Sequence, residues 1–155
     1  MSLLEIEEMD LDEINDMISE DNFAHLGCCK DNVPYVIPIN YAFIEPYIYI
    51  YTTEGKKSEI IVANPHVCLQ VEHIKSRAEW QSIVIDAFAH QVTDIEEREK
   101  AVAAILKINP TLTPAISVHW MDDWVRENIE VLFRIEPTVK TGRRTRPHVP
   151  KPRSP

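Results

Sequence analysis

The residues whose chemistry stands out form one short segment, Thr52-Thr53-Glu54-Gly55-Lys56-Lys57-Ser58. An alternating apolar run precedes it and a helical pattern follows, so the segment lies where a strand gives way to a helix. Gly55 permits an unusual backbone angle at such a turn, and free amides at a helix start favour an anion. Lys56 and Lys57 add two positive charges, and a phosphate monoester carries about −1.5 to −2 charges at neutral pH. The segment suits a phosphate, but taken alone it is better interpreted as a solvated surface turn.

The net charge of the chain is −9, and it is unevenly distributed. All 25 acidic residues lie at or before Glu136, whereas six of the 16 basic residues follow it. The body therefore has ten basic against 25 acidic residues, a net charge of −15, and the tail has +6. An acidic body repels nucleic acid, so we expect no nucleic-acid partner. A bound anion would need a local positive site such as the two lysines.

Composition indicates a soluble globular protein with one domain. The 155 residues are 45% apolar, and no apolar run is long enough to span a bilayer. The N-terminus becomes acidic at Glu5, which is not typical of a secretory signal. Three cysteines, two of them adjacent, favour reduced thiols and a cytoplasmic location. No pair of the six histidines has the spacing of a zinc site, so we expect no metal.

Hydrophobic periodicity predicts the elements that position these residues. Asp94 is the expected cap of one helix, whose apolar stripe includes Ile95, Ile105 and Leu106. The polar stretch 73–79 is predicted to be a loop. The domain is expected to cover residues 1–142, and the basic, proline-rich residues 143–155 are expected to be a disordered tail. The predicted helices are 10–20, 55–63, about 95–108 and 114–126, and the predicted strands are 23–29, 33–43, 47–52, 66–72, 80–92 and 129–135.

The order of these elements predicts an antiparallel barrel or curled sheet of the α+β class. Pro34 and Pro38 lie inside the second strand, so part of that strand should be an edge or a bulge. The third strand alternates Tyr47, Tyr49 and Tyr51 on one face with isoleucines on the other. The pattern alone leaves an OB-like barrel, a split barrel and a sandwich open.

A longer stretch is similar to a known family. The run VPYVIPINYAFIEPYIYIYTTEGKKSEIIVANPHVCLQVE, followed by WQSIVIDAFAHQV, resembles the pyridoxamine 5′-phosphate oxidase-like FMN-binding proteins. Among them it is most similar to the nitroimidazole-resistance-type branch. A final Leu-Phe-Arg-Ile strand and a Thr-Gly-Arg sequence extend the resemblance over roughly residues 20–142. It implies a split β-barrel, and a homodimer that holds FMN at the subunit interface.

The resemblance also implies which residues contact the cofactor. Lys56 and Lys57 would bind the FMN phosphate, helped by Thr52 or Thr53. A second set, Pro38, Ile39, Asn40 and Tyr41, would run beside the isoalloxazine ring and offer backbone groups to its polar edge. A third set, Trp80, Gln81, Ser82 and Ile83, would lie near the ring or the ribityl chain. Ile39 and Ile83 are the expected walls of the flavin slot, and Ser82 is an expected hydrogen-bond donor.

The chain departs from the family pattern at Ala87, where glycine is frequent, and at Val36, where true oxidases have a basic residue. Its basic tail replaces their C-terminal extension. We therefore expect an FMN-dependent oxidoreductase that transfers hydride or electrons to a small molecule other than pyridoxamine phosphate. The residues indicate no catalytic acid or base. Two alternatives remain open: a heme-binding or heme-degrading split barrel with His119 as ligand, and a non-enzymatic flavin sensor.

Overall fold

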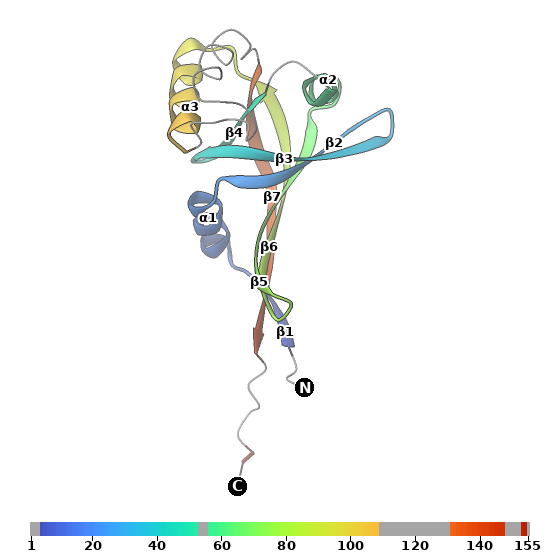
Figure 1. Ribbon diagram of the computed structural model, residues 1–155, viewed down its shortest axis with the longest axis vertical. Helices are drawn as coiled ribbons and strands as arrows, with labels where there is room; N and C mark the ends of the chain where they lie inside the picture. Colours follow the sequence, from blue (N-terminus) through green and yellow to red (C-terminus); the bar gives the residue numbers. More distant parts are fainter. Residues whose placement is uncertain (1–3, 53–55, 109–130, 148–152, 155) are drawn as a thin grey trace.

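The computed structural model describes residues 4–52, 56–108, 131–147 and 153–154 (Figure 1). Within this part of the chain, no helix is long and apolar enough to cross a membrane. The helices are α1 (Leu11–Glu20), α2 (Lys56–Ala63) and α3 (Ile95–Ile108). The strands are β1 (Leu4–Glu8), β2 (Phe23–Lys30), β3 (Val33–Ile44), β4 (Tyr47–Thr52), β5 (His66–Ser76), β6 (Glu79–Gln91) and β7 (Val131–Pro147).

The strands form one antiparallel sheet that closes on itself. Their order is β1-β7-β4-β3-β2-β5-β6, and β6 also pairs with β7. Six strands therefore make a barrel, while β1 pairs only with the C-terminal end of β7. β5, β6 and β7 extend past the barrel as a long arm that β1 joins (Figure 1). The predicted α+β split barrel is confirmed.

Side chains alternate between the two faces of each strand, so buried apolar residues form one cluster inside the barrel and a second cluster on its outer face. On β4, Ile48 and Ile50 are buried in the barrel interior. Tyr49 points the other way, into a second cluster that α3 covers with Ala101 and Ile105. Because both faces of β4 are buried, the tyrosine face predicted from the sequence serves to dock α3.

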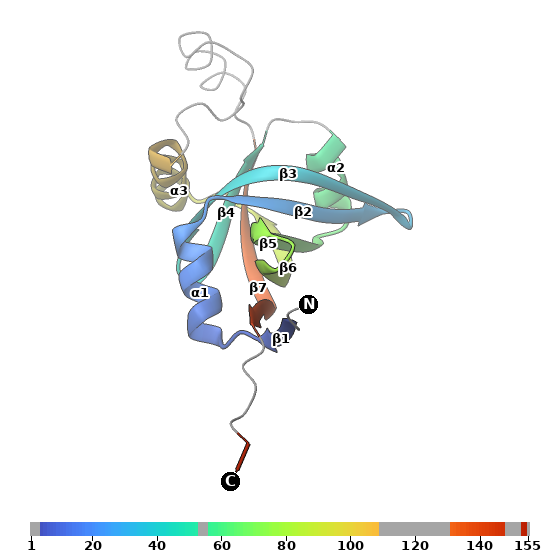
Figure 2. The same ribbon diagram turned by 60° about the horizontal axis from the view of Figure 1, so that its bottom comes forward.

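The helices occupy different sides of the barrel (Figure 2). α1 begins at its cap, Asp10, whose carboxylate accepts a hydrogen bond from the Glu13 amide at 2.9 Å. Its buried residues are Ile14, Met17 and Ile18. α2 lies by the β2–β3 hairpin, away from α1 and α3, and buries Ser58, Ile60 and Ile61 against the barrel end.

Several local predictions need correction. Ile95 is 73% exposed and Leu106 is also exposed, so Ala101 and Ile105 make the buried stripe of α3 instead. The predicted loop 73–79 is mostly strand, because β5 continues to Ser76 and β6 starts at Glu79. The predicted helix 114–126 and the first two residues of the predicted strand 129–135 lie outside the described residues.

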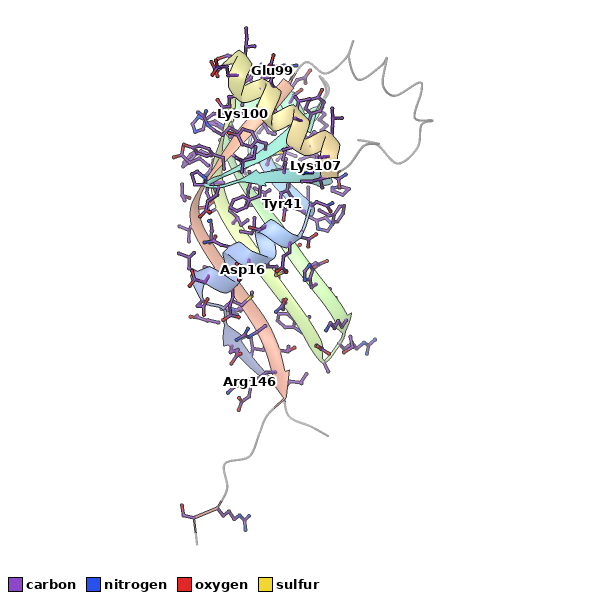
Figure 3. All side chains as sticks on the ribbon, turned by 90° about the vertical axis from the view of Figure 1, so that its left-hand side faces the viewer. Asp16, Tyr41, Glu99, Lys100, Lys107 and Arg146 are labelled. Atoms are coloured by element: carbon purple, nitrogen blue, oxygen red, sulfur yellow. The ribbon has the colours of Figure 1, made fainter. Side chains whose placement is uncertain are left out.

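The largest correction concerns the C-terminal segment. β7 continues to Pro147, and its last five residues pair with β1, a strand that the sequence analysis missed. Arg144 donates to Glu7 at 2.6 Å and also to Glu13 of α1. Figure 3 shows Arg146 at this end of β7, near β1. Residues 143–147 are therefore part of the folded domain, because the basic side chains of β7 meet acidic partners from the N-terminus.

Candidate functional site

The two lysines predicted to bind phosphate lie at the start of α2. Lys56 and Lys57 are its first two residues, so their amides belong to the first turn, where helix N–H groups lack intrahelical partners. Lys56 is exposed, and its ammonium lies 4.7 Å from the centre of the Tyr35 ring. Thr52 ends β4, while Thr53 lies outside the described residues. We call this helix start, with Tyr35 beneath it, the lysine corner.

Lys57 is less accessible than Lys56. Burial lowers the pKa of its ammonium below the usual value, and the neighbouring Cys28 acts in the opposite direction. Burial likewise raises the pKa of the Cys28 thiol, with Lys57 opposing the shift. Since a partly desolvated ammonium gains most from an anionic partner, an incoming phosphate would stabilise the charged form of Lys57.

The second predicted set lies on β3, where one edge of the strand is unpaired within the described residues. Val33–Asn40 pair with β2 alone, whereas β4 pairs with residues 41–44. The amide of Tyr41 donates to Asn22 at 2.9 Å, so odd-numbered residues of β3 bond toward β2 and even-numbered residues face the open edge. Pro34 and Pro38 are even-numbered and have no N–H. This edge therefore offers the carbonyl of Pro38 and the backbone amide of Asn40.

Two side chains of the second set are not available to a ligand. Tyr41 is buried, and its hydroxyl donates to the Ile18 carbonyl at 2.8 Å. Burial raises the pKa of this phenol, so it stays protonated. Ile39 is buried in the barrel core, as is Ile83 of the third set. The side chains of the two isoleucines therefore cannot form the walls of a flavin slot, as the sequence analysis expected.

The third set lies apart from the second. Trp80–Ile83 lie near the start of β6, and the order β3-β2-β5-β6 puts three strand spacings, about 14 Å measured along the sheet, between β6 and β3. Across these four strands, Pro38 pairs with His25, His25 with Gln70, and Gln70 with Val84. Gln70 in turn donates to Ser82 at 3.1 Å. One copy of the chain therefore joins the lysine corner to the β3 edge but does not bring Trp80–Ile83 beside them.

Sequence reasoning missed a pocket on the outer face of the sheet. Its volume is about 320 Å³, and its walls include all three cysteines, Cys28, Cys29 and Cys68, together with Tyr35. His66 and Asp86 also line it and form a pair at 2.8 Å. Period-two alternation predicts that Cys28 points inward and Cys29 outward. It gives no sign that Cys68 reaches the same pocket from another strand.

Comparison with known proteins shows which family the chain is similar to. A family model described as pyridoxamine 5′-phosphate oxidase matches residues 10–144. A curated Rhizobium meliloti protein, RA0666, is 32% identical over 77 residues, which are 50% of this chain. The matched part spans about half of that relative, 51% of its length.

Two solved structures share the fold over nearly the whole chain. An FAD-binding protein from Mesorhizobium loti is 26% identical with a TM-score of 0.75, covering 92% of this chain and 98% of its own. A Bacteroides thetaiotaomicron protein described as a putative 5-nitroimidazole antibiotic resistance protein is 20% identical with a TM-score of 0.70, covering 92% and 89%. With a family model that matches most of its length, this chain belongs to the pyridoxamine 5′-phosphate oxidase family.

Proposed function

We propose that the protein is a flavoprotein that binds FMN and works as an oxidoreductase. The observation that carries the proposal is the continuity between the lysine corner and the open edge of β3. Tyr35 belongs to the corner, and Asn40 lies five residues further along the same strand, a distance of about 16 Å. A phosphate held at Lys56 and Lys57 would leave the ribityl chain running along this edge and the ring beside Pro38 and Asn40.

The residues present suit each part of FMN. Two ammonium groups and the first-turn amides of α2, which helix geometry directs away from intrahelical partners, match a phosphate dianion. The Asn40 amide and the Pro38 carbonyl supply a donor and an acceptor for the polar edge of the ring. Bound FMN would supply the hydride or electron transfer itself, and the protein would hold it and leave one ring face accessible. FAD-binding by the Mesorhizobium relative supports a flavin in general.

The proposal includes a homodimer with the flavin at the interface. In one copy, Trp80–Ile83 lie about three strands from the β3 edge, so a second copy is the simplest source of these residues. The outer sheet face also exposes large apolar side chains, which favour association. Those on or beside that face are Val36, Val84, Phe88 and Val139, exposed by 66%, 48%, 41% and 54%.

The lysine corner gives the first test. We expect the double variant Lys56→Ala and Lys57→Ala to weaken FMN binding far more than folding, because each charge-assisted contact is typically worth about 1.5–3 kcal/mol. Fluorescence titration measures the affinity, and urea unfolding measures the stability. A matched control is Lys100→Ala with Lys107→Ala, two exposed lysines on α3 (Figure 3). Unchanged flavin occupancy in the corner variant would reject the phosphate site.

Purified protein separates this proposal from its alternatives. A yellow protein that releases fluorescent FMN supports the flavoprotein, and turnover of NAD(P)H with an added acceptor distinguishes an enzyme from a flavin sensor. A heme absorption band would instead support the heme alternative, whose ligand His119 lies outside the described residues. Protein that binds neither FMN nor heme would require another phosphorylated ligand.

A further inference from the structure

The lysine corner contains an aromatic residue to which the proposed function gives no role. Tyr35 lies on β3 directly opposite Cys28 of β2, and it packs partly against the barrel core. Its ring is therefore fixed by packing against the barrel core. The Lys56 ammonium lies over this ring, 4.7 Å from its centre, which is within the range of a cation–π contact.

This contact orients Lys56, because no ion pair in the described part of the chain involves its ammonium. A lysine side chain has four rotatable bonds, and the conformational entropy lost when they are ordered on binding weakens the affinity. A ring that already holds the ammonium removes part of that cost. The ammonium has three N–H donors, so contact with the ring on one side leaves donors on the other side for a phosphate oxygen.

We infer that Tyr35 is a positioning residue of the phosphate site, which presents the Lys56 ammonium to the phosphate of the flavin. The inference rests on the proposed function and adds a selectivity to it. Tyr35 should favour phosphorylated flavins over riboflavin, because only a phosphate uses the ammonium that the ring orients. The ring face carries this effect, so the tyrosine hydroxyl is dispensable.

Two substitutions separate the ring from the hydroxyl and from the fold. Tyr35→Phe keeps the ring face, and Tyr35→Leu keeps an apolar side chain without it. We expect Tyr35→Leu to weaken FMN binding about two- to fivefold, the range of an exposed cation–π contact, and to leave riboflavin binding unchanged. Tyr35→Phe should bind both flavins like the wild type. In a Lys56→Ala background, Tyr35→Leu should cause no further loss.

The outcomes distinguish this inference from the proposed function. Equal weakening of FMN and riboflavin by Tyr35→Leu would show a merely structural role and would overturn the inference. So would a Tyr35→Leu variant that binds FMN like the wild type, or a further loss in the Lys56→Ala background. In those cases the flavoprotein proposal would stand. Wild-type protein that binds neither flavin would overturn the proposed function and the inference together.

Discussion

At the residue scale, two of the chain's three glycines lie where a larger side chain would meet neighbours, but the neighbours differ. A Cβ at Gly142 would lie 2.9 Å from the Met9 sulfur and 3.1 Å from Ile14 Cγ1, both in the barrel core. A Cβ at Gly27 would lie 2.7 Å from the Cys68 sulfur. Cys68 is exposed, so its side chain can rotate away, whereas Met9 and Ile14 are confined.

The two alanine substitutions should therefore differ in stability. We expect Gly142→Ala to reduce the free energy of unfolding by about 1–3 kcal/mol, the usual cost of overpacking a core. Gly27→Ala should cost less than about 1 kcal/mol, although its closest contact is shorter. Urea unfolding of both variants measures the difference. A larger loss for Gly27→Ala would mean that Cys68 is fixed in place.

Single residues also show where sequence reasoning succeeded and where it failed. Lys56 and Lys57 start α2 as predicted, because a glycine turn and a helical pattern are local signals. Tyr35 was missed as part of the corner, since its contact with Lys56 joins β3 to a helix about twenty residues further along the chain. Ile39 and Ile83 were placed in the site, but their side chains are buried in the core. Alternation alone does not reveal which face of a strand is inside a barrel.

At the scale of elements, α3 is attached to the barrel by a polar cluster as well as by apolar packing. Arg134 of β7 donates to both Glu97 carboxylate oxygens, at 2.8 and 3.0 Å. The Tyr49 hydroxyl donates to the same carboxylate at 2.9 Å. The hydrogen bond from Arg134 lowers the pKa of Glu97, with a smaller contribution from Tyr49. Burial raises the pKa of Tyr49 to about 12, so its hydroxyl remains a donor at neutral pH.

This lowered pKa has a consequence for acid stability. A carboxylate with a lower pKa in the folded state stabilises the protein above its unfolded pKa and loses that contribution as the pH falls. Glu97→Gln should therefore reduce the free energy of unfolding at pH 7 by about 1–2 kcal/mol, a charged hydrogen bond discounted for partial exposure. The difference in free energy of unfolding between wild type and variant should disappear as the pH falls below 4.5, the ordinary pKa of a glutamate.

Urea unfolding of wild type and variant between neutral and acidic pH checks this. Glu99→Gln is the matched control, because Glu99 is exposed on the same helix (Figure 3). It should change stability little at any pH. A constant difference between wild type and Glu97→Gln from neutral to acidic pH would contradict the assigned role of the carboxylate.

At the scale of the whole molecule, local patterns identified most barrel strands but not how the two ends of the chain meet. The apolar alternation of β3 and β4 is visible within a short window. The segments Leu4–Glu8 and Arg143–Pro147 have few apolar residues, and each is a strand because the other lies beside it. Cross-strand pairs such as Arg144 with Glu7 join residues more than 130 positions apart. No short-range signal contains such a contact, so a basic tail was predicted where the barrel has its longest strand.

Truncation of the chain tests whether the pairing of β1 with the end of β7 stabilises the fold. A chain truncated after Gly142 would lose the β1–β7 pairing and the bonds of Arg144 to Glu7 and Glu13. It would also lose Thr145, which accepts from the Trp80 amide at 3.0 Å and donates to the Ala78 carbonyl at 2.9 Å. Each of these hydrogen bonds contributes about 0.5–1.5 kcal/mol, so we expect the truncation to reduce the free energy of unfolding by about 2–4 kcal/mol.

Full-length Arg144→Gln separates the charge from the strand. It keeps the backbone pairing with β1 and removes only the ion pairs, which contribute little to stability when solvent screens them. Urea unfolding should therefore rank the wild type first, Arg144→Gln second and the truncated chain last. If the truncated chain were as stable as the wild type, residues 143–147 would be dispensable. If Arg144→Gln lost as much as the truncation, charge pairing rather than strand pairing would hold the two ends of the chain together.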